Sequence, residues 1–233
     1  TERSTNNNII MDANIWFFDD VNLFKILCPH KYPAYTKDHK LSTYKKSDYI
    51  YFEEDAATKI FLIEKGKVKL RYYTEDGNEV VKAILTKGEL FGEKAILGEE
   101  KRNEIAEAMD DNTMLCPVKI EDVHDLMKDN QEFSFKIYKW IGFRMRKMER
   151  RIDNLVFKDV RSRLMDFIKE LSMEKGEKVG STIEMEHFFT HKNIANLIGT
   201  SRQTVTTTLN ELRDEGLIDF NRKKIIVKKP NEF

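Results

Sequence analysis

Short runs of apolar residues, some alternating with polar ones, follow one another between residues 41 and 118. We predict strands over residues 49–52, 60–64, 67–73, 79–85, 105–109 and 113–118. Turn residues separate these runs. Lys65-Gly66 and Asp76-Gly77-Asn78 are spaced as in hairpins, because Gly and Asn tolerate the positive φ of a tight turn. Short strands at this spacing favour a small antiparallel barrel or sandwich.

The hydrophobic period changes near residue 121. A short helix is predicted over residues 121–128, and a long one over residues 131–157, where no Pro occurs and only Gly142 weakly interrupts the pattern. Apolar residues recur along the long segment at alternating steps of three and four: Tyr138, Ile141, Met145, Met148, Ile152 and Leu155. This spacing is typical of a coiled-coil seam, so we predict a dimerisation helix. A helix packed only on its own domain is the alternative.

The remaining segment is predicted to contain three more helices and a hairpin. A helical period over residues 160–174 is followed by a polar stretch, residues 174–181, which we expect to be a surface loop. Residues 190–212 are predicted to form two helices joined at Gly199, with Thr190 and Ser201 as N-caps. Apolar runs at 217–220 and 224–228 flank a basic tip, Asn221-Arg222-Lys223. Together these elements predict a winged helix-turn-helix.

Polar and basic residues gather at the start of the second of these helices and at the hairpin tip. An Arg can bond guanine O6 and N7 together, and a Gln can bond adenine N6 and N7, so Arg202 and Gln203 are the expected base-contacting residues. Basic side chains nearby would neutralise phosphates. The predicted DNA-contacting set is Thr190, Lys192, Ser201, Arg202, Gln203, Thr206, Thr207, Arg222, Lys223 and Lys224. A structural three-helix domain with a solvated basic face is the alternative.

Charge is unevenly distributed along the chain. The 233 residues contain 40 Lys and Arg against 40 Asp and Glu, a formal net charge of zero. Residues 1–138 carry 20 basic and 26 acidic side chains, whereas residues 139–233 carry 20 basic and 14 acidic ones. The basic C-terminal part is therefore the candidate for binding a polyanion.

Composition and cysteine spacing exclude several classes of protein. With 40% hydrophobic and 34% charged residues, the chain is globular. It contains no run of 18 apolar residues and begins with a polar stretch, so we expect a cytoplasmic protein without membrane contact. Cys28 and Cys116 lack CxxC spacing, which disfavours disulfides, zinc and an iron–sulfur cluster. The His-x-His, HExxH and GxSxG patterns are missing, so we expect neither a metal site nor an enzyme.

A second group of candidate binding residues follows the predicted strand at residues 79–85. Phe91-Gly92-Glu93-Lys94-Ala95-Ile96 is followed by Arg102. A glycine at a helix start exposes backbone N–H groups to an anion, a carboxylate can accept from a ribose hydroxyl, and an arginine can pair with a phosphate. Such a combination also arises readily by chance, so the residues alone leave both readings open.

Residues 194–205 resemble the DNA-binding signature of the cAMP receptor protein/FNR superfamily of bacterial transcription regulators. Their sequence is Ile-Ala-Asn-Leu-Ile-Gly-Thr-Ser-Arg-Gln-Thr-Val. Asn154-Leu155 and Phe157-Lys158-Asp159-Val160 also resemble that family, as does the order of barrel, long helix and winged helix. The resemblance extends from about residue 40 to the C-terminus.

The resemblance implies an α+β fold with three parts. These are a sensory barrel of the cyclic-nucleotide-binding jelly-roll type (residues 1–128), a dimerisation helix with a hinge (129–158), and a winged helix-turn-helix DNA-binding domain (159–233). It also implies a homodimer that binds an inverted-repeat operator in double-stranded DNA, controlled by an effector at the barrel and working with RNA polymerase. Gln203 replaces the family's usual Glu, and Thr207 replaces a second base-reading Arg, so we expect a different operator.

Within the resemblance, residues 91–96 look like the phosphate-binding cassette of cyclic-nucleotide domains. Gly92 opens it, Glu93 takes the ribose role and Arg102 the phosphate role. Asn103 and Glu104 stand where nucleotide-binding members have Ser or Thr and then Ala, and a carboxylate there repels a phosphate. An internal ion pair between Glu93 and Arg102 is therefore an alternative.

The effector is left open by these departures. Met148 and Glu149 occupy the places where nucleotide-binding members contact adenine. We therefore do not favour cAMP, and a cyclic-nucleotide-responsive activator remains an alternative. A ligand-sensing protein-docking module that does not bind DNA is a second one. His30, His39 and His124 are candidate haem ligands by residue type only.

Overall fold

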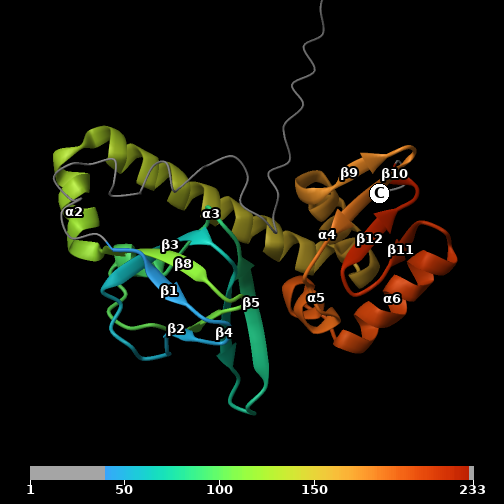
Figure 1. Cartoon of the computed structure of the whole chain (residues 1–233), viewed down its shortest axis with the longest axis horizontal. Coiled ribbons are helices and arrows are strands. Elements are labelled where there is room, and N and C mark those ends of the chain that lie inside the picture. Colours follow the sequence, from blue (N-terminus) through green and yellow to red (C-terminus); the bar gives the residue numbers. More distant parts are fainter. Residues whose placement is uncertain (1–39, 231–233) are drawn as a thin grey trace, which may run out of the picture.

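The computed structural model describes residues 40–230. They form an N-terminal domain of two β-sheets, a long helix that leaves it, and a C-terminal domain of three helices and a small sheet (Figure 1). The expectations for Cys28, His30, His39 and the polar N-terminus lie outside the described residues. Within residues 40–230, no helix combines the length and the apolar character needed to cross a bilayer.

The N-terminal domain is a jelly-roll sandwich of two antiparallel four-stranded sheets, in the orders β1-β8-β3-β6 and β2-β7-β4-β5. The strands are β1 (Ser42–Tyr44), β2 (Tyr49–Tyr51), β3 (Lys59–Lys65), β4 (Val68–Tyr73), β5 (Glu79–Leu85), β6 (Leu90–Phe91), β7 (Ile105–Ala108) and β8 (Thr113–Lys119). Buried side chains from both sheets, among them Tyr51, Phe61 and Leu115, form one core cluster.

The predicted antiparallel fold is confirmed, although the two sheets do not join through hydrogen bonds into a closed barrel. All six predicted strands are present, with ends that shift by a residue or so. The short strands β1 and β6 were not predicted. Each contributes only two or three residues, too few for an apolar alternation to be visible in the sequence.

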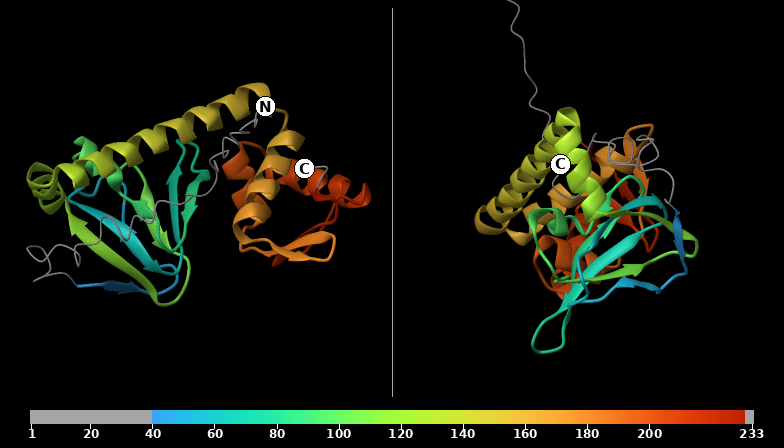
Figure 2. Two further views of the ribbon diagram at one scale, coloured as in Figure 1. Left: turned by 90° about the horizontal axis from the view of Figure 1, so that it is seen from above. Right: turned by 90° about the vertical axis from the view of Figure 1, so that its left-hand side faces the viewer.

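Two helices follow the jelly roll, α2 (Ile120–Asp129) and α3 (Gln131–Phe157). Asn130 separates them, and its side chain caps α3 by accepting from the Phe133 amide at 2.9 Å. Phe133, Ile137 and Trp140 are buried against the outer face of the β1-β8-β3-β6 sheet, in a cluster that includes residues of β3 and β8. The second half of α3 then extends away from the sheets toward the C-terminal domain (Figure 2).

The C-terminal domain is a winged helix-turn-helix, as predicted. Its elements are α4 (Val160–Lys175), β9 (Glu177–Val179), β10 (Thr182–Glu186), α5 (His191–Ile198), α6 (Arg202–Asp214), β11 (Ile218–Phe220) and β12 (Lys224–Val227). The four strands form an antiparallel sheet in the order β11-β12-β10-β9. Leu164, Phe167, Ile198 and Leu209 are among the buried residues of its core.

The prediction of a loop over residues 174–181 was partly wrong. α4 continues to Lys175, and β9 begins at Glu177 and pairs with β10. Polar composition suggested a loop because β9 is fully exposed and lies at the edge of the sheet. Its pairing depends on β10, where Ile183 and Met185 alternate with acidic residues and pair with β12.

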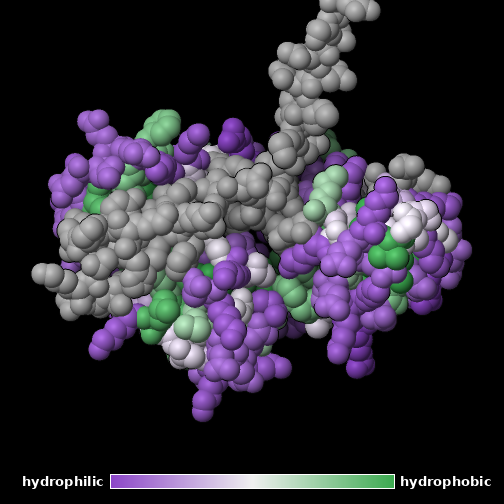
Figure 3. All heavy atoms as spheres, turned by 45° about the horizontal axis from the view of Figure 1, so that its top comes forward, coloured by the Kyte–Doolittle hydropathy of each residue, from purple (hydrophilic) through white to green (hydrophobic). Residues whose placement is uncertain are grey.

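The two domains are in direct contact through β5. Val81 and Ile84 of that strand are buried in the same hydrophobic cluster as the core of the C-terminal domain. Figure 1 shows β5 at the side of the jelly roll that faces α5, and residues of the two elements pack together. The C-terminal domain is therefore held by the end of α3 and also by the edge of a sheet. Both domains present a mostly hydrophilic surface in Figure 3, with small hydrophobic patches.

Candidate nucleic-acid interface

Local hydrogen bonds fix the two helices of the helix-turn-helix. The Thr190 hydroxyl accepts from the Asn193 amide at 3.1 Å, and the Asn193 side chain accepts from the Thr190 amide at 3.0 Å, which forms a capping box. The Ser201 hydroxyl accepts from the Thr204 amide at 3.0 Å and caps α6. Both predicted N-caps are therefore confirmed as caps.

Gly199 ends α5 in the left-handed region, with φ at 71°. A Cβ atom at this position would lie 2.5 Å from Leu155 Cδ2, so a side chain here would be strained and would also collide with α3. Glycine thus allows the turn and a close approach of the last turns of α3 to the helix-turn-helix.

One face of α6 packs on the domain core and the other faces solvent. Val205, Thr208, Leu209 and Leu212 are buried, whereas Arg202, Gln203 and Thr207 are exposed. The exposed set contains both predicted base-contacting residues. A helix whose first turn presents Arg and Gln to solvent can insert into the major groove and read base edges.

Thr206 is placed differently from its predicted neighbours. Its hydroxyl donates to the Arg202 carbonyl oxygen at 3.0 Å, and its oxygen lies 2.8 Å from His191 Nδ1. The hydroxyl hydrogen is thus engaged within the protein and is not available to donate to DNA. His191 was not predicted as a site residue, because the hydrophobic period of the sequence does not show that its ring contacts α6.

The wing tip presents two cations to solvent. Asn221 closes it, since its side-chain oxygen accepts from the amides of Lys223 at 2.8 Å and Lys224 at 2.9 Å. Arg222 and Lys223 are exposed, and no carboxylate of the described chain lies within ion-pair distance of either. Lys224, in contrast, forms an ion pair with Glu184 of β10. Of the three cations predicted at the wing, Arg222 and Lys223 thus have no carboxylate partner among residues 40–230.

Lys192 is bound to the jelly roll. Its ammonium lies 3.0 Å from Glu79 Oε2, at the start of β5. Burial disfavours the charge of Glu79, but the hydrogen bond from Lys192 and the charge of Lys69 outweigh it and hold the pKa of the carboxyl below its ordinary value. Lys69 and Arg71 both pair with Glu79, and they also pair with Glu107, at 3.3 and 3.0 Å respectively. The contact between Lys192 and Glu79 therefore belongs to a larger ionic network.

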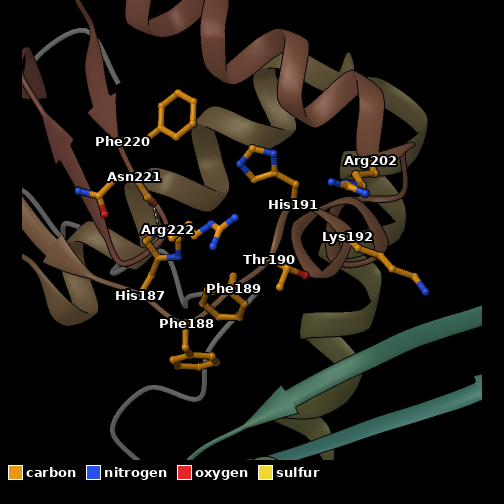
Figure 4. A pocket seen from close by; sticks show the side chains of 10 residues that line it. All are labelled: His187, Phe188, Phe189, Thr190, His191, Lys192, Arg202, Phe220, Asn221 and Arg222. Carbon is orange, nitrogen blue, oxygen red and sulfur yellow. Dashed lines mark hydrogen bonds between the residues drawn. The ribbon is translucent and has the colours of Figure 1, made fainter.

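A cleft of about 760 Å³ separates the helix-turn-helix from the wing. Figure 4 shows its side chains: the ring of His191 lies between Arg202 and Arg222, whereas Lys192 points out of the cleft. The residues that line it are His187, Phe188, Phe189, Thr190, His191, Lys192, Arg202, Phe220, Asn221 and Arg222. No acidic residue is among them, so the cleft is cationic with aromatic walls.

The predicted dimer seam is a row of exposed apolar side chains that runs along α3 from Tyr138 to Leu155. Tyr138, Met145, Met148 and Ile152 are 58–64% exposed, and Leu155 is 45% exposed. Ile141 departs from the prediction, because it packs partly against the buried cluster beneath α3. The helix turns its first apolar stripe toward the sheet and its second away from it.

Two arginines attach the end of α3 to the helix-turn-helix. Arg151 donates to the Leu197 carbonyl oxygen at 2.9 Å. Arg163 donates to the carbonyl oxygens of Lys158 at 2.8 Å and Gly199 at 3.3 Å. Asp159, between the helices, caps α4 by accepting from the Ser162 amide at 2.7 Å. The predicted hinge is therefore a hydrogen-bonded joint.

The candidate effector residues come together only in part. Glu93 begins η3, a 3₁₀ helix (Glu93–Leu97) that follows Gly92, where φ is 76°. Arg102 donates to the Gly92 carbonyl oxygen at 3.0 Å and to that of Lys59, and its guanidinium lies over the Tyr51 ring. Burial lowers the pKa of Arg102.

Glu93 forms an ion pair with Arg144, and not with Arg102 as the sequence suggested. Its carboxylate lies 2.6 Å from Arg144 of α3, so the ion pair expected with Arg102 is replaced by one that joins η3 to the long helix. The Glu104 carboxylate lies 2.5 Å from Lys82, which offsets the repulsion of a phosphate expected from it. Asn103, Met148 and Glu149 are exposed.

These contacts do not fit a cyclic nucleotide as they stand. The carboxylate expected to bind ribose is engaged by Arg144, and the guanidinium expected to bind phosphate is engaged by backbone carbonyls.

Comparisons with known proteins agree with this geometry. Residues 41–130 match the family model of the cyclic nucleotide-binding domain, and residues 162–233 match that of the Crp-like helix-turn-helix domain. The global nitrogen regulator of Nostoc sp. is 30% identical over 210 residues, which cover 90% of this chain and 92% of that protein. This chain belongs to the Crp/Fnr family of transcription regulators. The family resemblance of residues 194–205 is thus confirmed.

Other members of the Crp/Fnr family show the same extent of similarity. The cyclic AMP receptor protein of Thermus thermophilus is 28% identical and covers 84% of this chain, which covers 87% of it. A solved structure of a CooA mutant from Carboxydothermus hydrogenoformans superposes with a TM-score of 0.75 at 26% identity, covering 94% of this chain and 96% of that one. The similarity of this Crp/Fnr regulator to these relatives thus extends over both of its domains.

Proposed function

We propose that this chain acts as a homodimeric, sequence-specific transcription regulator that binds an inverted-repeat operator in double-stranded DNA. The observation that carries the proposal is the exposed surface of α6 and the wing: Arg202, Gln203, Arg222 and Lys223 are exposed, and no carboxylate of residues 40–230 lies within ion-pair distance of the three cations. Arg202 and Gln203 would read base edges in the major groove, and the wing would contact phosphates. Thr190 and Ser201 would act chiefly as helix caps.

Dimerisation would occur along α3, through the exposed row of Tyr138, Met145, Met148, Ile152 and Leu155. A symmetric dimer of this kind sets its recognition helices about 34 Å apart, one turn of B-DNA, so the half-sites should be inverted and separated by that distance. We propose the parts as residues 1–128, 129–158 and 159–233, with the exposed row in the middle part. A DNA partner would place the protein in the cytoplasm. We also propose RNA polymerase as a further partner, and we propose no catalytic activity.

Signals at the jelly roll would reach DNA through the contacts of α3 with both domains. Glu93–Arg144 joins η3 to α3, and Arg151 joins α3 to the helix-turn-helix. A ligand that changes the first contact would shift the second and alter the population of DNA-binding arrangements. The chemical class of the effector stays unassigned. The protein-docking alternative finds no supporting observation, and the family's Crp-like helix-turn-helix favours DNA.

Two substitutions test the proposed DNA contacts. Arg202→Ala should cost about 1–3 kcal/mol per half-site and relax discrimination at one base pair, because the lost contact reads a base edge. Lys223→Ala should weaken binding to all sequences alike, because its contact is with a phosphate. Dissociation constants for the operator and for single-base variants of it measure both effects. Equal effects of the two substitutions on every sequence would contradict the assignment.

A further inference from the structure

The cleft between the helix-turn-helix and the wing contains a histidine whose hydrogen-bonding state can be deduced. His191 is the first residue of α5, and its Nδ1 lies 2.8 Å from Thr206 Oγ1. The Thr206 hydroxyl donates its single hydrogen to the Arg202 carbonyl oxygen at 3.0 Å. Its oxygen therefore accepts from His191, so Nδ1 carries a hydrogen. The ring nitrogen that can gain or lose a proton is Nε2.

The groups that face His191 are cationic or aromatic. Arg202 of α6 and Arg222 of the wing lie on either side of its ring (Figure 4), and the Phe220 ring centroid is 5.9 Å from its own. His187, on the loop before α5, is also cleft-lining, and its Nε2 lies 3.2 Å from the Asn221 carbonyl oxygen. Lys192, on the same helix as His191, is turned toward Glu79 of β5. The described residues that line the cleft include no acid.

This environment disfavours a positive charge on His191 in the free protein. Burial and the nearby charge of Arg202 lower its pKa. An anion bound beside the His191 ring would reverse the second effect, because it offsets the repulsion by Arg202 and attracts the imidazolium. The cleft thus has room and charge for an anionic group whose binding favours protonation.

We propose that the cleft holds one backbone phosphate of the DNA and that His191 binds it through Nε2–H, so that each half-site takes up one proton on binding. The inference rests on the proposed function. In helix-turn-helix proteins the first helix crosses the DNA backbone while the second enters the major groove. The cleft lies between the start of α5, the start of α6 and the wing, where a strand of DNA that passes from one to the other would run. A phosphate contact of this kind adds affinity without sequence information.

The test compares DNA affinity between about pH 6 and pH 8 at constant ionic strength, for the full chain and three single variants. The key variant is His191→Asn, whose side-chain amide can still donate to Thr206 but cannot be protonated. His187→Asn is the matched control within the cleft, and His124→Asn, on α2, is the control outside it. Each protein is titrated with an operator duplex obtained by selection and with a random-sequence duplex of equal length, because a phosphate contact acts on both.

The wild-type chain should bind both duplexes more tightly as the pH falls. If binding raises the pKa of His191 by about one unit, the gain approaches about tenfold per half-site, and about a hundredfold for the dimer, as the pH falls below the lowered pKa of the free chain, and it is smaller at higher pH. The same proton should steepen the salt dependence at low pH, by about 0.9 per half-site in the slope of log K against log salt. His191→Asn should abolish both effects, and the two control variants should retain them.

Two results would overturn the proposal. A pH dependence that persists in His191→Asn, or that disappears in His187→Asn instead, would place the proton elsewhere. Tight binding that is independent of pH in every variant would leave no role for protonation of the cleft. Both differ from a failure of the proposed function, in which neither duplex would bind even at low salt and low pH.

Discussion

Glu79→Gln should make this regulator bind DNA more tightly. In the free chain Lys192 is held by Glu79 at 3.0 Å, and its side chain is 53% exposed. Lys192 cannot give its ammonium fully to a DNA phosphate while it keeps this ion pair. Glutamine has the size of glutamate but no charge, so the substitution releases Lys192 with little change in packing. Lys69 and Arg71 retain Glu107 as a partner, which preserves the rest of the network.

The expected gain follows from the exposure of the pair. Exposed ion pairs contribute about 0.2–1 kcal/mol, and a dimer would break two of them on binding DNA. The total of about 0.4–2 kcal/mol corresponds to binding that is about twofold to about thirtyfold tighter. Because the pKa of Glu79 is lowered in the folded chain, its charge is fully present above the ordinary carboxyl value and is lost only as the pH falls through the lowered one. The gain should thus be constant between about pH 6 and pH 8, in contrast to the effect proposed for His191.

A double-mutant cycle separates this competition from a general change in charge. Fluorescence anisotropy with an operator duplex gives dissociation constants for the wild type, Glu79→Gln, Lys192→Met and the double variant. Glu64→Gln is the control, because it removes the same charge from the jelly roll. Glu64 pairs with Lys87 at 3.8 Å and not with Lys192. Glu79→Gln should have almost no effect once Lys192 is replaced. An equal gain with and without Lys192, or an equal gain in Glu64→Gln, would show that Glu79 does not compete with DNA for Lys192.

Two other substitutions test the jelly roll and the seam. Gly92→Ala places a Cβ 2.7 Å from Arg102 Nη1 at a φ of 76°, and it should lower Tm more than Gly98→Ala, where φ is 92° and no atom lies within 4 Å. We expect a cost of about 1–2 kcal/mol for the backbone alone, and a Tm for Gly92→Ala no lower than for the control would contradict the packing described. Met148→Lys should raise the dimer dissociation constant more than a hundredfold. The two Met148 side chains would become buried in the dimer, and their burial contributes about 3 kcal/mol or more. Sedimentation should show Asp153→Lys, on another face of α3, still dimeric; a dimeric Met148→Lys would remove the seam.

The helix-turn-helix could be predicted because its signals are local. Thr190 and Ser201 cap helices through residues three positions further along, and Gly199 supplies the left-handed turn within the same segment. The long helix α3 was likewise predicted with its observed bounds, since its start and end depend on nearby residues. In such segments the hydrophobic period and the capping residues agree, so pattern and structure coincide.

The contacts that place the domains could not be predicted, because they join residues far apart in the chain. Glu93 meets Arg144, and Lys192 meets Glu79, across 51 and 113 positions of sequence respectively. The prediction of a loop over residues 174–181 was partly wrong for a related reason. β9 is polar and forms a strand only because it pairs with β10. Thr206 was expected to face DNA, and its hydroxyl proved to be engaged by the carbonyl of Arg202.

A homodimer that reads DNA through α6 is tested by a selection of bound duplexes from random DNA with the purified full chain, performed with and without cAMP. We expect enrichment of an inverted repeat whose half-sites lie about one helical turn apart, in equal measure in both conditions. A variant carrying Arg202→Ala should lose preference at one position of each half-site. Enrichment of no motif, or of a single unrepeated site, would contradict the proposal of a dimeric regulator that reads DNA through α6.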